Sequence, residues 1–175
     1  MKCNSSKFPS NQKTVAKSTK IFNNFENYIY CLGFFWQNFN NLELQLRIYL
    51  NRKSGNDGFH VRNCLNMKVG EECKENAITD FKSFGDLCKS FNSYQEENNK
   101  IDFNDFIALR DALAHGRVAG DNSGNMSVIK YSKPKNGKAI VEYKLNLSIE
   151  EMKKIGEKIA KIGMDISFIG GAKII

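Results

Sequence analysis

The segment 109–117 carries the side chains best suited to chemistry in this sequence. It reads Leu-Arg-Asp-Ala-Leu-Ala-His-Gly-Arg and sets Arg110 five positions before His115, in a chain with only two histidines. A guanidinium is always charged and binds phosphate oxygens in a fork, whereas an imidazole exchanges protons near neutral pH. The pair would suit cleavage of an RNA phosphodiester without a metal. Arg110 would stabilise the transition-state charge, and His115 would transfer a proton to or from the reacting oxygens.

The spacing of this pair predicts a site shared by two copies of the chain. At about 100° per residue, Arg110 and His115 lie about 140° apart around a helix axis, so one straight helix does not aim both at one target. A two-fold axis would bring the same helix end of two subunits together. Ala112 and Ala114 leave room for that contact, and Asp111 would orient the arginine or hydrogen-bond across it. We therefore expect a homodimer with RNA as its partner.

Two other interpretations of the same residues stay open. In a structural role, Arg110 would pair with a nearby carboxylate and His115 would cap helix carbonyls near Gly116. The chain would then be a non-catalytic helical module that binds RNA, a nucleotide or a protein partner, or else a plain dimeric scaffold. Loss of RNA cleavage on substituting either residue would separate the enzyme from both.

Apolar periodicity predicts helices on the N-terminal side of this segment. Steps of three and four predict a long helix over about 20–50, central to the core, after which 51–70 has the composition of a loop. A second helix is predicted over about 77–93, and a third begins after an Asp102 N-cap and ends at Gly116. The stripe of the first helix comprises Phe22, Phe25, Ile29, Leu32, Trp36, Phe39, Leu42, Leu46 and Leu50, widened by Tyr28, Phe35 and Tyr49.

The C-terminal third switches from strand to helix periodicity. Alternating residues on both sides of Asn136-Gly137 predict a β-hairpin over about 126–147. A capping box, Ser148 to Glu151, opens a last helix that runs to about Ile169, in which Gly156 and Gly163 would admit another helix closely. The predicted fold class is mainly α, a bundle of four main helices with a β-hairpin inserted before the last one.

Charge is distributed unevenly along the 175 residues. The net charge of +7 comes from both ends of the chain, while the middle, which holds Arg110 and His115, is mildly acidic. Residues 1–20 are rich in Lys, Ser and Asn and predict a flexible basic arm, so a single domain would occupy 21–175. The candidate RNA-binding residues are Arg117, Lys130, Lys133, Lys135 and Lys138, although a solvated lysine surface explains the same pattern.

Cysteine and histidine usage bounds the cofactor chemistry. Five cysteines without a CxxC spacing, and two histidines remote from any cysteine pair, predict no metal site and no cofactor. Reduced thiols, no apolar signal segment and no long apolar run predict a cytoplasmic protein with no membrane partner. His60 has no partner that the sequence identifies.

The pattern Arg-x4-His, with a polar residue directly after the arginine at the end of a late helix, resembles the HEPN superfamily (higher eukaryotes and prokaryotes nucleotide-binding). The resemblance covers about 20–169, and its specific part is Leu109 to Gly116. It implies a dimeric, metal-independent endoribonuclease of a toxin–antitoxin, abortive-infection or CRISPR defence system, and so an antitoxin or defence partner. Arg110 and His115 fall on the family's catalytic positions and Asp111 on its polar position.

One position departs from a sub-group of that superfamily. Members paired with nucleotidyltransferase antitoxins have a tyrosine two residues after the histidine, as the target of modification. This chain has Arg117 there. The resemblance therefore implies a nuclease that is regulated in another way, and the lysine-bearing hairpin would be an addition to the family fold.

Overall fold

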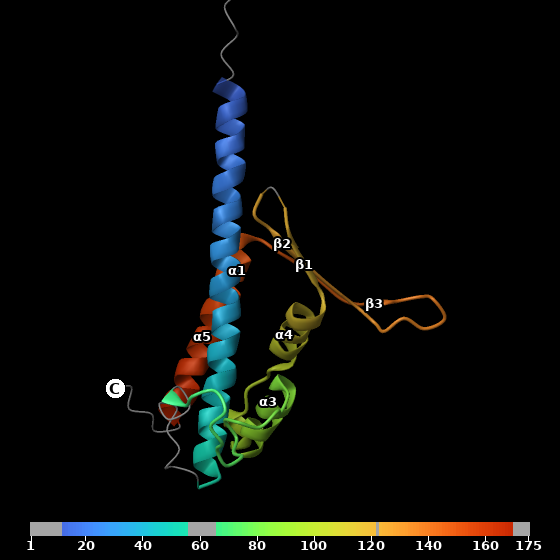
Figure 1. The fold of residues 1–175 in the computed structure, drawn as a ribbon. Helices are drawn as coiled ribbons and strands as arrows, with labels where there is room; N and C mark the ends of the chain where they lie inside the picture. The colour runs from blue at the N-terminus through green and yellow to red at the C-terminus, as the bar shows by residue number, and fades with distance from the viewer. Residues whose placement is uncertain (1–11, 56–65, 122, 170–175) are drawn as a thin grey trace, which may run out of the picture.

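The structure is a computed structural model that describes residues 12–55, 66–121 and 123–169. This part of the chain is mainly helical, with a small antiparallel sheet between the last two helices, so the predicted fold class is confirmed (Figure 1). In chain order its elements are α1 (Gln12–Lys53), α3 (Phe84–Ser93), a 3-10 turn (Glu97–Asn99), α4 (Asn104–His115), β1 (Arg117–Gly120), β2 (Met126–Tyr131), β3 (Val141–Leu147) and α5 (Ile149–Ile169).

Helix α1 is the axis of the molecule, and α5 runs parallel to it (Figure 1). At 1.5 Å per residue, its 42 residues span about 63 Å. The predicted close approach at the two glycines of α5 is confirmed. A Cβ on Gly156 would lie 3.0 Å from the Phe34 ring, and one on Gly163 would lie 3.8 Å from the Cα of Leu42. The capping box that begins α5 is also confirmed, because Ser148 and Glu151 exchange side-chain to backbone hydrogen bonds of 2.8 and 3.2 Å.

The buried face of α1 differs from the predicted stripe. Phe25, Ile29 and Trp36 are 55, 50 and 37 % exposed, so the prediction is wrong for these three. The core side chains lie along a neighbouring line of the helix surface, against which α5 and α3 pack. They are Tyr28, Cys31, Phe35, Phe39, Leu42, Leu46, Tyr49 and Leu50, and all of them except Cys31 belong to the predicted stripe or its widening.

Helix α3 begins at Phe84, later than the predicted start near Ala77. The reason is local hydrogen bonding. The Asn76 side chain accepts from the Ile78 N–H at 2.8 Å and makes a turn, and Ser83 caps the helix by accepting from the Asp86 N–H at 3.2 Å. Phe81, expected on the apolar face of this helix, lies in the turn region and is fully exposed.

Both ends of α4 differ in detail from the prediction. Asp102 accepts from the Asn104 N–H at 3.0 Å, but Phe103 occupies the N-cap position. Gly116 ends the helix in an extended conformation rather than a left-handed one. Glycine is needed there for space, because a Cβ would lie 2.3 Å from the Ala112 carbonyl oxygen and 2.8 Å from that of Ile129.

The predicted hairpin is confirmed as β2 and β3, and the sequence missed β1. β1 pairs antiparallel with β2, which makes a three-stranded sheet in the order β1-β2-β3. β1 has only four residues, all exposed, so it carries no alternation to detect. In the β2–β3 connection Asn136 and Gly137 have φ of 52° and 72°, and Lys135 and Lys138 exchange backbone hydrogen bonds. This is the two-residue turn that Asn-Gly favours.

The arm predicted over residues 1–20 is partly helical. Helix α1 begins at Gln12, so residues 12–20 of the predicted arm are helical. Residues 1–11 and His60 lie outside the described residues. None of the described helices is both long enough and apolar enough to cross a membrane.

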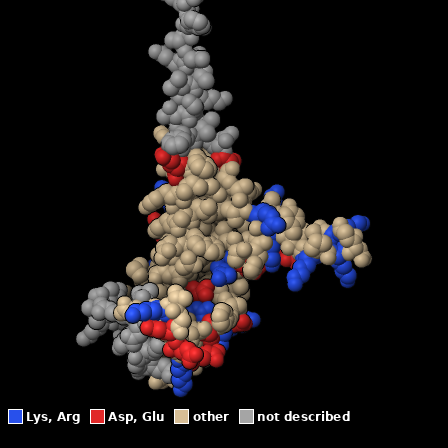
Figure 2. Space-filling view, in the orientation of Figure 1, with Lys and Arg blue, Asp and Glu red and all other residues tan. Residues whose placement is uncertain are grey.

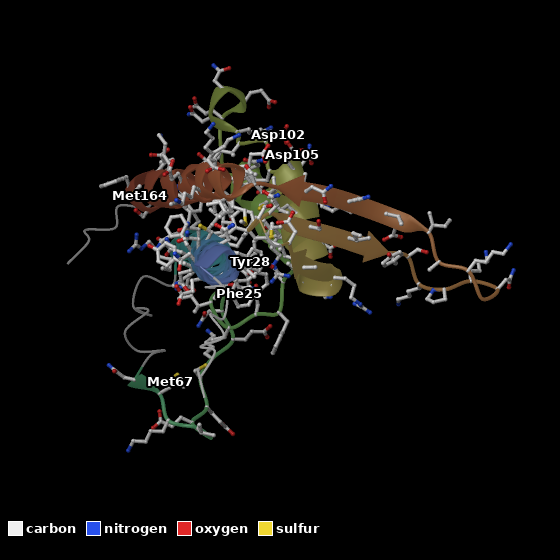
Figure 3. All side chains as sticks on the ribbon, turned by 90° about the horizontal axis from the view of Figure 1, so that it is seen from above. Phe25, Tyr28, Met67, Asp102, Asp105 and Met164 are labelled. Carbon is white, nitrogen blue, oxygen red and sulfur yellow. The ribbon has the colours of Figure 1, made fainter. Side chains whose placement is uncertain are left out.

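The outer parts of β2 and β3, with the turn between them, form a projecting arm, defined here as residues 130–144. Seen along α1, the arm runs outward from the helical body to a turn that no helix covers (Figure 3). Blue side chains gather at its outer end (Figure 2). Within 126–147 the chain has five lysines and one acidic residue, so the arm is a basic extension of the sheet.

Candidate functional site

Helix α4 is fixed by its buried face, which leaves its polar residues on other sides. Phe106, Leu109 and Ala112 are buried at steps of three and pack into the core. Arg110 and Asp111 follow Leu109 directly and His115 is the last residue of the helix. The side chains of these three are 30, 42 and 65 % exposed. Their helix is therefore a rigid support for groups that solvent reaches.

Arg110 points towards α1 and is held there by Glu43. Its Nη2 donates to Glu43 Oε2 at 3.2 Å, and within the described ranges the rest of the guanidinium makes no hydrogen bond. Glu43 also accepts from Arg47 at 3.0 Å through its other oxygen. One carboxylate thus holds two arginines, and Nε and Nη1 of Arg110 stay available to a ligand.

Arg47 ties α1 to the turn before α3. Its Nη1 lies 2.7 Å from Asp80 Oδ1, and its guanidinium also donates to the carbonyls of Ala77, Asp80 and Lys82. The side chain is only 12 % exposed. Burial, followed by the nearby charge of Glu43, raises the pKa of the Cys88 thiol to about 12. This side of the site, defined as the Glu43 cluster (Glu43, Arg47, Asp80 and Arg110), is built into the body.

His115 and Asp111 lie on the other side of α4, next to the sheet. His115 Nε2 is 3.8 Å from Asp111 Oδ1, one helical turn back, and Lys130 Nζ of β2 is 2.7 Å from Asp111 Oδ2. Asp111 therefore stands between an imidazole and an ammonium group. It holds its position through Lys130, and it lies near His115 without a hydrogen bond to that ring.

A fourth member, Glu142, reaches this cluster because the sheet is irregular. The register shifts between Lys130 and Tyr131, so that Glu142 has no cross-strand partner. Such a bulge redirects side chains, and the Glu142 carboxylate lies 3.2 Å from Lys130 Nζ. Hydrogen bonds from Lys130 to Asp111, and then to Glu142, raise the pKa of this lysine. We call Asp111, His115, Lys130 and Glu142 the Asp111 cluster.

The Asp111 cluster lines a groove of about 740 Å³ between the end of α4 and the arm. The groove is open to solvent, and its further lining residues are Tyr131, Ser132 and Lys133. It therefore combines an imidazole, an aromatic ring, two lysines and two carboxylates. Because Lys130 lies against both carboxylates, Lys133 is the lysine of this lining that is left for an anionic ligand.

The structure brings together only some of the predicted site residues. His115, Asp111, Lys130 and Lys133 share the groove, whereas Arg110 does not line it. The remaining predicted residues lie elsewhere. Arg117 is exposed at the start of β1 and donates to the Gly116 carbonyl, and Lys135 and Lys138 close the turn of the arm. Within one chain, therefore, Arg110 and His115 face different surroundings, as their 140° offset predicts.

Sequence reasoning missed Glu43, Arg47, Tyr131 and Glu142. Glu43 and Arg47 carried a signal, because opposite charges four residues apart on a helix form pairs. Their long-range partners carried none, since Asp80 and Arg110 join them only through the fold. Glu142 reaches Lys130 because of the bulge, and no residue pattern in the sequence predicted that bulge.

In residues 12–55, 66–121 and 123–169, no three His, Cys, Asp or Glu side chains are grouped as a metal centre would require. Comparison of this chain with protein-family models, characterised proteins and solved structures finds no match.

Proposed function

We propose that this chain is a metal-independent endoribonuclease with a composite active site where the α4 ends of two copies meet. The observation that carries the proposal is the end of α4 itself. One short helix presents an exposed imidazole to an open groove, and on another side it presents an arginine with a free guanidinium edge. RNA is the expected partner and the chain is expected to be a homodimer.

The reaction would be an in-line transfer within the RNA. The ribose 2′-oxygen attacks phosphorus, its proton passes to one His115 imidazole, and the bond from phosphorus to the 5′-oxygen breaks. The His115 of the second copy donates a proton to that leaving oxygen. The products are a 2′,3′-cyclic phosphate and a 5′-hydroxyl, so atoms and charge balance without a cofactor.

Arg110 would stabilise the phosphorane-like transition state. Its Nε and Nη1 make no hydrogen bond to a described residue, and a planar fork binds two phosphate oxygens at once. Glu43 would act as a positioning residue, since it fixes Nη2 and so fixes the plane of the fork. Asp111 lies 3.8 Å from the His115 ring, and a small movement of either side chain would let it position that histidine.

A second copy is needed because a single chain separates the two groups. Arg110 is turned towards α1, and His115 is turned towards β2. A two-fold contact between the α4 ends would place Arg110 of one copy near His115 of the other. Gly116 and the small Ala114 keep the end of the helix free of bulky side chains there.

The first experiment measures RNA cleavage by the full chain in excess EDTA. We expect cleavage to persist and to leave 2′,3′-cyclic phosphate ends or their hydrolysis product. His115→Ala should lower the rate by at least about 100-fold, the usual contribution of a general acid or base. Arg110→Lys should also lose most activity, because it keeps the charge and removes the fork.

The controls separate loss of chemistry from loss of fold. His60→Ala removes the other histidine and should cleave like the unsubstituted chain. Melting temperatures of all variants should stay close to that of the unsubstituted chain, because Glu43 keeps Arg47 when Arg110 changes. Full activity in both His115→Ala and Arg110→Lys would rule out the proposed site.

A non-catalytic module is the second candidate, and one observation favours it. Arg110 is ion-paired with Glu43 at 3.2 Å, which is the contact that a structural arginine would make. In that case RNA would bind without being cut under any condition, and Arg110→Lys would lower stability instead of activity.

The biological setting belongs to the same proposal. A toxin or defence nuclease that acts in the cytoplasm should slow growth when its expression is induced, and His115→Ala should relieve that effect. An antitoxin or another defence partner would be recognised as the protein whose co-expression restores growth with the unsubstituted chain.

A further inference from the structure

We propose that the groove between the end of α4 and the projecting arm binds single-stranded RNA, with Tyr131 stacked on one base and the lysines of the turn on the adjacent phosphates. The inference rests on the proposed function for the identity of the nucleic acid. It goes further by naming the strandedness of the substrate and the residues that hold it.

The groove leads from the proposed catalytic histidine to the arm without interruption. His115 and Lys133 line the same groove, and Lys133 is followed within a few residues by Lys135 and Lys138. A strand whose scissile phosphate lies at His115 would therefore continue along the lysines. Continuity with the site distinguishes these lysines from others on the surface.

Tyr131 is placed to receive a base. It ends β2 at the bulge, lines the groove, and is 49 % exposed although it is an aromatic residue. Tyr143, the other tyrosine of the sheet, is partly buried against the core, and burial raises the pKa of its phenol. An exposed aromatic ring between lysines is the usual platform for an unpaired base.

The lysines of the turn have free charges, unlike Lys130. Lys133, Lys135 and Lys138 are exposed and make no ion pair with any described residue, whereas Lys130 contacts both Asp111 and Glu142. We therefore assign phosphate contacts to the three turn lysines. Lys130 instead holds the wall of the groove, which revises the prediction that it contacts RNA directly.

Single strands fit this arrangement better than duplexes. A base within a duplex is stacked on both faces, so it cannot lie on Tyr131 unless it leaves the helix. The reciprocal backbone hydrogen bonds of Lys135 and Lys138 fix the turn, so the backbone that carries the three exposed lysines is held in place. A basic segment of this kind can follow the backbone of a single extended strand.

The test measures binding by fluorescence anisotropy on the full chain carrying His115→Ala, which prevents cutting. The probe is a fluorescein-labelled, unstructured RNA of about 12 nucleotides, within the range of single-strand sites, and the same strand annealed to its complement. We expect the single strand to bind more tightly. Tyr131→Leu should raise its Kd about tenfold.

Charge is tested by the salt dependence of the same binding. Replacing Lys133, Lys135 and Lys138 with Ala should lower the slope of log Kd against log salt by about 2, whereas Lys130→Met should leave the slope unchanged. The matched controls are Tyr30→Leu, for an exposed tyrosine of α1, and Ala at Lys68, Lys74 and Lys89, for an equal loss of charge at exposed positions near α3. Both should bind like the parent.

The outcomes separate this inference from the proposed function. Duplex binding as tight as single-strand binding, or arm variants that bind like the controls, would overturn the groove assignment even if the unsubstituted chain cuts RNA. Binding that depends on Tyr131 and the turn lysines, together with no cleavage by the unsubstituted chain, would uphold the groove and overturn the nuclease.

Discussion

Glu43 and Asp111 each lie between two basic side chains, but they do so in different surroundings around α4 and at different depths. Glu43 joins Arg110 to Arg47, whose side chain is 12 % exposed and bound to three carbonyls. Asp111 joins Lys130 to His115, whose side chain is 65 % exposed. The same charge pattern thus occurs once in the body and once at the surface.

The difference in burial distinguishes the cluster that stabilises the fold from the cluster that would take part in catalysis. An ion pair removed from water is costly to break, because its remaining partner stays desolvated. An exposed pair contributes little, because water and salt screen it. We therefore expect substitutions of Arg47 or Asp80 in the Glu43 cluster to lower stability, and substitutions in the Asp111 cluster to lower RNA cleavage while stability changes little.

The largest stability effect should come from Arg47→Met. It leaves three carbonyl groups without their arginine donor and removes the closest cation from Asp80, and we expect the free energy of unfolding to fall by about 3 kcal/mol. Urea denaturation followed by circular dichroism measures it. Arg117→Met, at an exposed arginine of β1, is the control. An equal loss of stability in both variants would contradict the expectation that the buried arginine contributes more than an exposed one.

Gly116→Ala tests the junction between the two clusters. A Cβ there would lie 2.3 Å from the Ala112 carbonyl oxygen, so the end of α4 must shift away from β2. We expect a loss of about 2 kcal/mol and reduced cleavage, because His115 moves with the helix end. Gly33→Ala, in α1 with open space around it, should instead stabilise the protein by about 0.5 to 1 kcal/mol.

Cysteine labelling tests independently whether the helical body shields Cys88 from solvent. Cys88 is buried and its pKa is raised to about 12, so iodoacetamide at pH 8 should label the exposed Cys73 and spare Cys88. Peptide mass spectrometry distinguishes the two. Glu43→Gln should leave Cys88 protected, because burial rather than the Glu43 charge is the larger cause of the shift. Rapid labelling of Cys88 in the unsubstituted chain would contradict this account of the body.

The smallest effect should come from Lys130→Met, and it should depend on pH. The pKa of Lys130 is raised in the folded state, so its contribution to stability is complete below the ordinary lysine pKa and is lost as pH rises through the raised value. The melting-temperature difference between Lys130→Met and the parent should be small at neutral pH and vanish at alkaline pH. A melting-temperature difference that grows with pH would contradict the raised pKa of Lys130 in the folded state.

Elements with strong local signals were predictable. The capping box fixed the start of α5, Asn136-Gly137 fixed the turn of the arm, and the α5 glycines pointed to a close helix contact. The capping box and the turn are made by residues that are near in sequence. The two glycines are informative because, inside a helix, this residue type indicates a close contact. The Arg-x4-His segment was found for the same reason, since both residues sit on one helix end.

Features set by the fold were not predictable. Phe25 and Ile29 are as apolar as the core residues of α1, yet they lie on a side of the helix that the described fold leaves exposed. Glu43 meets Arg110 across 67 positions, and Glu142 meets Lys130 through a bulge. The early start assigned to α3 failed because the side chain of Asn76 competes with helical hydrogen bonds.

The composite site is tested most directly by mixing subunits. The unsubstituted chain and His115→Ala are refolded together at equal amounts, and RNA cleavage is measured per total protein. If one site needs both histidines, only dimers of two unsubstituted chains cut, and activity should fall to about one quarter of that of the unsubstituted chain alone. Activity of about one half would mean that each chain cuts on its own, and it would contradict the shared site.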